Sequence, residues 1–287
     1  MSIGQLARGR TPAPARRAAA HDPLLIAAAL VLVAVIGIAL LGPLRSPYDP
    51  DQLYAGAVSA PPSLAHPFGT DDLGRDVLSR VLAGARPSIA GPVIVVAVST
   101  MLGVAVAVAS AWFGGAVDGI ASRLVDVIFA IPGLVLAVLA VAMFGKGLLA
   151  PVVALSIAYM PIVVRLVRAG ARAELGRPYI AALRIQGVGS LAICFRHLLP
   201  ALLPTILAQA TVGFGYAMLD IAAISFLGLG AQPPASDWGV MIAGGQPALL
   251  TGAPEQSMFP AALIVLTVLA VNIVGARTTT WAEAKDR

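Results

Sequence analysis

The chain has little charge: only 11% of its 287 residues are Asp, Glu, Lys or Arg. This is less than half of the ~25% found in an average soluble domain. Hydrophobic residues make up 59% of the sequence, and a soluble domain needs more polar side chains than the remainder supplies to cover its surface. The composition therefore excludes an ordinary cytosolic enzyme and an intrinsically disordered chain, and it predicts a protein that crosses the membrane several times.

Residues that commonly build catalytic centres are also scarce. Cys194 is the single cysteine, so no intramolecular disulfide can form, and three histidines far apart argue against a built-in zinc site. The one Gly-Lys pair, Gly145-Lys146, lacks the upstream glycine and the following Ser or Thr of a nucleotide-binding P-loop. No HExxH or GxSxG motif occurs. We therefore predict that the chain is not an enzyme, does not hydrolyse ATP, and holds no metal or cofactor of its own.

Six stretches are long and apolar enough to cross a bilayer, which takes ~20 residues. They are residues 24–42, 88–112, 123–144, 148–167, 201–229 and 258–276. The first could be a signal peptide, but Gly42-Pro43-Leu44 follows it instead of an Ala-x-Ala-like cleavage site, which favours a retained anchor. The predicted fold class is an all-α polytopic membrane protein with about six transmembrane helices.

The basic residues predict the orientation, because cytoplasmic loops carry the excess of Lys and Arg. With both termini in the cytoplasm, fourteen basic residues lie inside and five lie outside. The five outside are Arg45, Arg75, Arg80, Arg86 and Lys146. Cytoplasmic arginines also explain the net charge of +5, so we expect no nucleic-acid partner.

The cytoplasmic loop 168–200 has internal order. Pro178 can occupy the first helical position, where its missing N–H costs nothing. About two helical turns follow, and Gly187 is suited to a left-handed stop. The sequence thus predicts a short helix outside the bilayer, flanked by arginines, which is a candidate docking element.

This segment resembles the EAA loop of binding-protein-dependent ABC importer permeases. Ala182 and Gly187 are in register with the loop pattern, and His197-Leu-Leu-Pro200 completes it after nine intervening residues. The usual glutamate of the loop is replaced by Ala181, and its second alanine by Leu183.

Other stretches are similar to the C-type permease of dipeptide, oligopeptide and nickel importers. The longest is HPFGTDDLGRDVLSRVLAGARPSI at His66–Ile89. The others are LVDVIFAIPGLVLA at Leu124–Ala137, RHLLP at Arg196–Pro200 and FLGLGAQPPASDWGVMIAGG at Phe226–Gly245. Together the similar stretches extend from about residue 24 to residue 276, and the tail after Arg277 does not match.

The resemblance implies a type I ABC importer permease in the inner (cytoplasmic) membrane. Two paralogous permease chains would line one pathway, separate ATPase subunits would bind ATP and Mg²⁺, and an external substrate-binding protein would deliver di- or oligopeptides. Nickel complexes and haem-like solutes use similar permeases. Four parts are then expected: a basic tail (1–22), the first span with a large outer loop (23–87), a core permease domain (88–277) and a cytoplasmic tail (278–287).

Particular residues are candidates for the coupling role. Tyr179, Ala182, Leu183 and Gln186 share one helical face by their spacing, and we expect this face, ended by Gly187, to contact the ATPase. The alternative is that these side chains pack on helices of the same chain.

Charged and aromatic residues elsewhere are candidates for other roles. Asp220 falls in an apolar run, where a carboxylate is costly, so it either lines the pathway or pairs with the partner permease. Asp126 is expected to pair with Arg123 on the same helix. The remaining candidates either belong to a surface helix packed at the membrane edge or serve as a structural brace or a contact for the binding protein; they are Asp72, Arg75, Asp76, Arg80, Asp237 and Trp238.

A second function stays open, namely a stand-alone secondary transporter or channel that uses Asp220 for ion coupling. It would require another carboxylate deep in a span, and the six predicted spans offer none.

Overall fold

The computed structural model describes residues 22–54 and 56–285. In this part of the chain the regular secondary structure is helical, apart from one isolated bridge between Thr70 and Asp76. The helices are α2 (Pro23–Arg45), α3 (Val77–Phe113), α4 (Gly115–Phe129), α5 (Gly133–Phe144), α6 (Leu149–Leu175), α7 (Pro178–Ile185), α8 (Ser190–Ile193), the π-helical turn η1 (Cys194–Leu198), α9 (Leu199–Phe226), α10 (Trp238–Gly244), α11 (Gln246–Leu250) and α12 (Glu255–Lys285).

Within the described residues, five helical stretches are long and apolar enough to cross a membrane, and α4 with α5 makes a sixth if the two are counted as one span. The five are Pro23–Gly42, Val77–Phe113, Leu149–Leu175, Ser190–Phe226 and Glu255–Arg277. The predicted all-helical membrane fold is confirmed.

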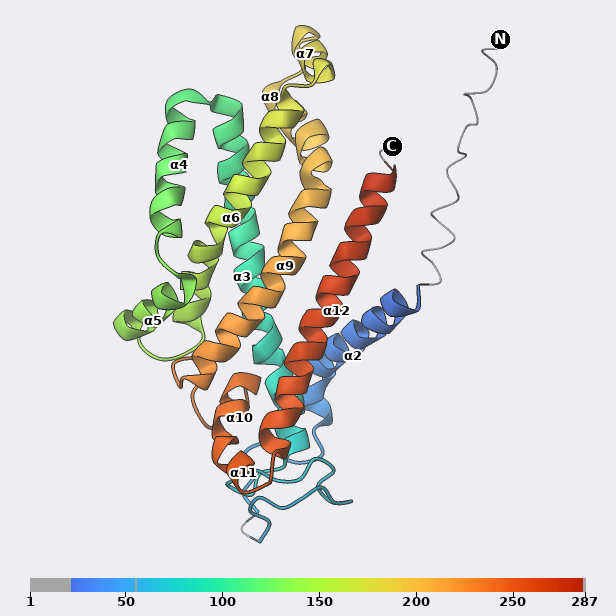
Figure 1. Cartoon of the computed structure of the whole chain (residues 1–287), viewed down its shortest axis with the longest axis vertical. Coiled ribbons are helices and arrows are strands. Elements are labelled where there is room, and N and C mark those ends of the chain that lie inside the picture. The colour runs from blue at the N-terminus through green and yellow to red at the C-terminus, as the bar shows by residue number, and fades with distance from the viewer. Residues whose placement is uncertain (1–21, 55, 286–287) are drawn as a thin grey trace, which may run out of the picture.

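The third span differs from the prediction. A continuous helix was expected over 123–144, but α4 and α5 are bent by 80° at the break between them. Pro132 stands at the break with an extended ψ of 132°. Proline has no N–H to donate and disfavours a helical conformation in the residue before it, so the helix stops here and restarts at Gly133. Figure 1 shows that α4 runs beside α6, and that α5 turns away from the direction of α4.

Several helices are longer than the apolar runs that predicted them. The boundary expected at 87/88 falls inside α3, which begins at Val77, and the expected tail after residue 277 continues α12 to Lys285. At the cytoplasmic loop, α6 runs on to Leu175, so only α7 and its short connections stand between the long helices. Of the predicted tail 1–22, only Asp22 is described, and its carboxylate caps α2 by accepting from the Leu24 N–H at 3.1 Å.

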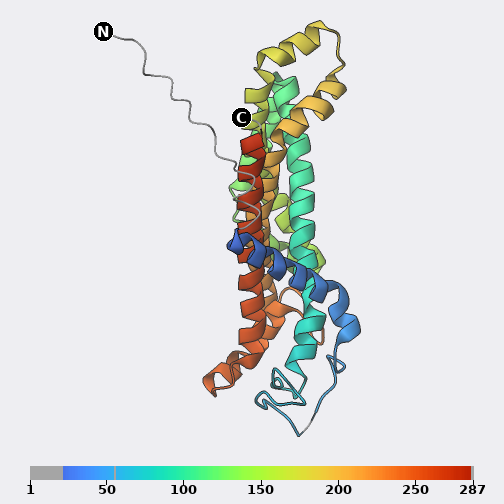
Figure 2. The same cartoon turned by 90° about the vertical axis from the view of Figure 1, so that its right-hand side faces the viewer.

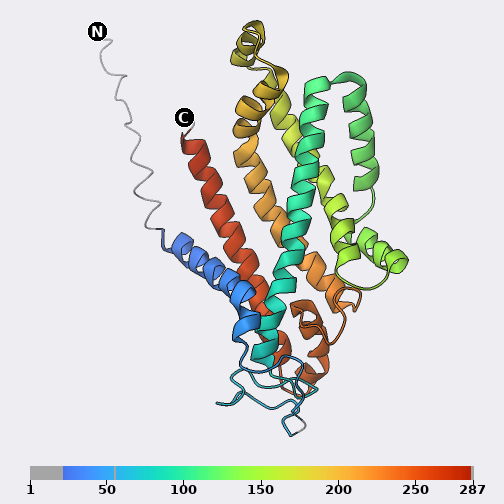
Figure 3. The same ribbon diagram turned by 180° about the vertical axis from the view of Figure 1, so that it is seen from behind.

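The core forms around α3, which packs against α2, α6 and α9 (Figure 3). Close approach depends on small residues: a Cβ at Gly103 would come within 2.7 Å of Val163 on α6. One at Gly91 would come within 2.9 Å of Ile221 on α9. Small residues allow helix backbones to approach closely in membranes, where burial from water does not drive helix association.

The two ends of the bundle carry different segments. α7 and the C-terminal end of α12 lie at one end, while the loop 46–76 with α10 and α11 lies at the other (Figure 1). In the view of Figure 2, α7 and its connections project beyond the remaining helices. This arrangement agrees with the predicted grouping of cytoplasmic and outer loops.

Candidate functional site

The short helix predicted from Pro178 to Gly187 is present as α7. Pro178 occupies the first helical position, and Gly187 adopts a φ of +77° directly after the C-cap residue Gln186. The Val188 N–H then donates to the Leu183 carbonyl at 3.1 Å, as in a left-handed helix stop. Proline and glycine therefore set both ends of α7 through local backbone chemistry.

The exposed side of α7 differs in part from the predicted contact face. Ala182 and Gln186 are exposed, but Leu183 is half-buried and Tyr179 is engaged with its own chain. Ile185 is 88% exposed, and it was missed by the sequence analysis. The sequence did contain a signal for the exposure of Ile185. It is an apolar residue two positions before Gly187, on the side of the helix away from the buried Ile180.

Ile180 and Arg184 both contribute to the attachment of α7 to the bundle. The side chain of Ile180 is fully buried. The Arg184 guanidinium lies over the Trp112 ring, 4.9 Å from the ring centroid, and so connects α7 to the end of α3. The short helix is thus seated on the long helices.

A buried carboxylate connects α6 to α7. The Tyr179 hydroxyl donates to Glu174 Oε1 at 2.6 Å, and Arg177 Nε lies 3.0 Å from Oε2. Burial and the hydrogen bond to Glu174 raise the pKa of Tyr179 to about 12. The phenol therefore remains a donor throughout the physiological range.

Next to this junction, α3, α4 and α6 are held together by Asp118. Ser110 Oγ donates to Asp118 Oδ1 at 2.5 Å, and both Arg168 and Arg172 of α6 pair with the same carboxylate. Hydrogen bonds to charged groups are among the stronger ones in proteins. The ends of the three long helices below α7 thus form one connected unit.

The expected pair of Arg123 and Asp126 is wrong. Asp126 pairs instead with Arg165 of the neighbouring α6, whose Nη2 lies 2.6 Å from Oδ1. The guanidinium of Arg165 also lies 4.3 Å from the centroid of Phe129. Spacing along one helix could not predict this contact, because the better-placed cation comes from another helix.

Asp220 lies on α9 and faces α6. Its carboxylate is half-buried, and Oδ2 accepts a hydrogen bond from the Tyr159 hydroxyl at 2.7 Å. Ser99, Thr100 and Gln209 line a small void beside Tyr159. In the described part of the chain, no group of three or more His, Cys, Asp or Glu could hold a metal ion.

A larger cavity lies between α5 and the beginning of α6. Its volume is about 710 Å³, and apolar side chains line most of it, with Lys146 as the one charged residue. A zwitterionic peptide needs partners for both of its charges, so this cavity lacks the chemistry of a peptide site.

The outer-loop residues do not form the predicted surface helix. Asp72 and Arg75 precede α3, and Asp76 is its N-cap, accepting from the Ser79 N–H at 2.7 Å. Oδ1 of Asp76 also lies 2.9 Å from His66 Nδ1. Arg80 forms ion pairs with Asp51 and Asp71.

Asp71 is fully buried, whereas the candidate chosen from the sequence was its neighbour Asp72. Arg75 Nε lies 2.6 Å from Asp71 Oδ2, but 4.0 Å separates Arg75 from Asp72. The Asp71 carboxylate also accepts from the N–H groups of Leu73 and Arg75 at 2.9 and 2.8 Å. A tight turn before α3 therefore buries Asp71. Its i,i+4 spacing to Arg75 is a signal for this pair, although the pair forms outside any helix.

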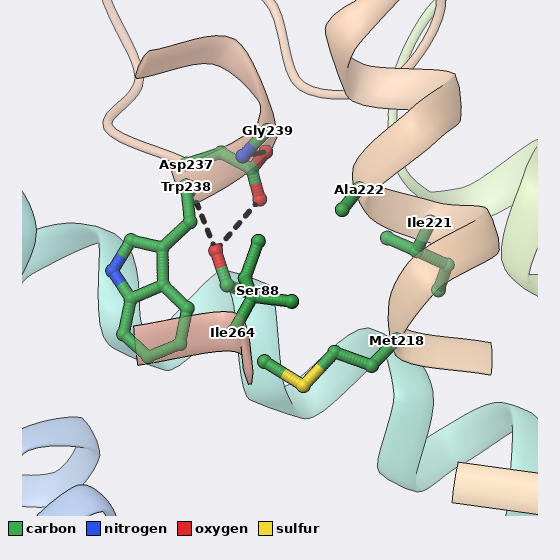
Figure 4. A pocket seen from close by; sticks show the side chains of 8 residues that line it. All are labelled: Ser88, Met218, Ile221, Ala222, Asp237, Trp238, Gly239 and Ile264. Atoms are coloured by element: carbon green, nitrogen blue, oxygen red, sulfur yellow. Dashed lines mark hydrogen bonds between the residues drawn. The ribbon is translucent and has the colours of Figure 1, made fainter. Parts of the chain in front are cut away.

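Asp237 and Trp238 are buried at the contact between α10 and α3 (Figure 4). Asp237 caps α10 by accepting from the Gly239 and Val240 N–H groups at 3.0 and 3.2 Å. Ser88 of α3 donates to Asp237 and accepts from the Trp238 N–H, both at 2.9 Å. Burial raises the pKa of Asp237. Because both residues are about 1% exposed, their arrangement suits a brace and not a contact with a soluble protein.

Comparison with known proteins identifies the family. Residues 99–285 match the family model described as "Binding-protein-dependent transport system inner membrane component". The di/tripeptide transport system permease protein DppC of Pseudomonas aeruginosa (strain UCBPP-PA14) is 36% identical over 262 residues, which cover 89% of this chain and 86% of the relative. The glutathione transport system permease protein GsiD of Pectobacterium atrosepticum is 37% identical over 251 residues, covering 87% and 83%.

Solved structures agree on the fold. The chain aligns with the inward-facing MetNI methionine ABC transporter with a TM-score of 0.57 and 21% identity, over 71% of this chain and 96% of that one. It also aligns with an amino acid ABC transporter with a TM-score of 0.50 and 19% identity. The chain therefore belongs to the family of binding-protein-dependent transport system inner membrane components, and it is a multi-pass inner-membrane permease subunit of an ABC importer.

Proposed function

We propose that the chain forms half of the translocation pathway for di- or tripeptides or a related small peptide, with a paralogous permease chain forming the other half. The names of its relatives support this substrate class, since they transport di/tripeptides and glutathione. Two ATPase subunits supply the energy, and an external binding protein delivers the peptide. The outer loops 46–76 and 230–254 lie on the side where such a protein would dock.

The observation that carries the proposal is the position of α7. It stands at one end of the bundle between α6 and the continuous helix of α8, η1 and α9. Its outer side presents Ala182, Ile185 and Gln186 to solvent. We infer that an ATPase groove receives this side, and that α6 and α9 carry its displacement into the membrane. ATP must then favour one arrangement of these helices over another, which is the thermodynamic condition for coupling.

Replacement of Gly187 by valine tests the docking role. A Cβ added at Gly187 would meet no atom within 4 Å, so a valine side chain would not clash there. The φ of +77° at this position is nevertheless strained for valine. The left-handed conformation costs a non-glycine residue about 1–2 kcal/mol, which frays the end of α7. We expect co-purification of the ATPase and uptake of radiolabelled Ala-Ala to fall severalfold.

Gly189→Val is the matched control. Gly189 lies in the same loop, also has open space, and adopts an ordinary φ of −62°. It should retain uptake and the ATPase. Normal uptake and an intact complex with Gly187→Val would contradict the docking role of α7.

A stand-alone transporter driven through Asp220 is the second candidate function. The feature that favours it is a half-buried carboxylate within a span. The hydrogen-bond partner of Asp220, however, is the uncharged side chain of Tyr159. An ion-coupling site would gain from a second carboxylate at this position. Reconstitution of the purified chain alone separates the two functions: ion-driven uptake without other subunits would establish transport through Asp220 and contradict the proposed dependence on ATPase subunits.

A further inference from the structure

The joint between α6 and α7 consists of two residues, Gly176 and Arg177. Gly176 remains near helical, with φ −79° and ψ −7°, while Arg177 is extended, with φ −72° and ψ 142°. Pro178 follows, and its ring fixes its own φ. The direction of α7 relative to α6 therefore depends on a few backbone torsions, and a glycine is one of the residues that supply them.

Glu174 spans this joint with both carboxylate oxygens. Oε1 accepts from the Tyr179 hydroxyl on α7 at 2.6 Å, and Oε2 lies 3.0 Å from Nε of Arg177, the residue that caps α7. The side chain belongs to the last turn of α6 and is 7% exposed. One carboxylate thus holds the end of one helix to the beginning of the next.

Tyr179 extends the contact to the other leg of the loop. Its ring lies 6.2 Å from the ring of His197, centroid to centroid, and His197 belongs to η1, which continues into α9. Glu174, Tyr179 and His197 therefore connect α6, α7 and the start of the α9 helix at one point.

We propose that Glu174 is a positioning residue that locks α7 rigidly to α6, so that displacement of α7 moves the membrane helices instead of bending the joint. The inference rests on the proposed function, since it assumes that α7 receives the ATPase. Glu174 is outside the loop pattern of Ala182, Gly187 and His197–Pro200, and it was not among the residues predicted from the sequence.

The stiffness follows from burial. Bending the joint separates Glu174 from both partners at once, because both lie beyond Gly176. A buried carboxylate without partners is strongly unfavourable, and hydrogen bonds to a charged group are roughly twice as strong as neutral ones. Glu174 consequently restricts the joint to one geometry. Without it, only the buried Ile180 and the contact of Arg184 with Trp112 hold α7 in place, and the backbone at Gly176 can bend more easily.

Three variants of the complete importer test this proposal: Glu174→Ala, Glu174→Gln and Tyr179→Phe. The measurement is the number of radiolabelled Ala-Ala molecules imported per ATP hydrolysed, in proteoliposomes that contain both permeases, the ATPases and the binding protein. We expect Glu174→Ala to retain ATPase activity and to lower this ratio by at least about fivefold, the lower end of typical coupling factors. Glu174→Gln keeps an acceptor for Tyr179 and should fall between Glu174→Ala and the wild type.

Tyr48→Phe is the matched control, because it also removes one tyrosine hydroxyl bond, from Tyr48 to the Ala65 carbonyl at 2.8 Å in the outer loop. It should leave the ratio unchanged. If Glu174→Ala fails to assemble, Glu174→Gln and Tyr179→Phe decide the question, since both keep the size of the side chain.

An unchanged ratio in assembled variants would overturn the role of Glu174, and so would an equal loss with Tyr48→Phe. Failure of the wild-type chain to recruit an ATPase is a different result and would overturn the proposed function itself.

Discussion

Replacing Asp237 by alanine would remove the centre of the buried junction between α10 and α3. Three donors lose their acceptor: the N–H groups of Gly239 and Val240 and the hydroxyl of Ser88. All three residues are buried or half-buried, so water does not readily replace the carboxylate. The change removes a helix cap and a contact between helices in one step.

The loss of stability in Asp237→Ala combines a lost helix cap and a buried donor without an acceptor. Loss of an N-cap side chain costs about 1 kcal/mol, and a buried donor left without an acceptor costs about 1–3 kcal/mol. Asp237→Ala should therefore destabilise the folded chain by about 2–4 kcal/mol.

Asn is a milder change at position 237. Its amide oxygen can still cap α10, its NH₂ can donate to Ser88 Oγ, and no charge has to be buried. We expect a cost of about 1 kcal/mol or less for Asp237→Asn, within the range of one hydrogen bond.

Thermal unfolding of the purified importer in nanodiscs measures the difference, with Ser88→Ala and the Ser88→Ala/Asp237→Ala double variant completing a mutant cycle. The double variant should be less destabilised than the sum of the two single variants, because each single variant already breaks the contact between Ser88 and Asp237. Equal melting temperatures for Asp237→Ala and wild type would refute the reasoning, and so would an Asp237→Asn variant as unstable as Asp237→Ala.

Two further predictions concern pH and topology. Because burial raises the pKa of Asp237, the folded state binds its proton more tightly than the unfolded state, so the stability of the wild type should fall as the pH rises from about 4 through the raised value. Asp237→Asn should lack this component, and parallel pH profiles of melting temperature for the two proteins would contradict it. A reporter fused at Arg184 should be cytoplasmic and one fused at Gln52 should be external; the reverse result would refute the orientation.

Local signals in the sequence predicted much of this architecture. Apolar runs between charges identified the spans, since a bilayer imposes their length. Pro178 and Gly187 predicted both ends of α7, because each acts through its own backbone torsions. Charge spacing was a poorer guide: Arg123 and Asp126 had suitable helical spacing, but Asp126 pairs with Arg165.

The limits of prediction follow from the range of each interaction. Apolar length, proline and glycine act within a few residues, so the sequence by itself determined the membrane class, the approximate spans and the short helix. Only the tertiary structure decided that the third span bends by 80° and that Asp71 and Asp237 are buried. It also decided that Glu174 connects two helices. A buried charge is placed by the partners that fold around it, and residues far apart in the chain, such as Ser88 and Asp237, meet only when the helices pack.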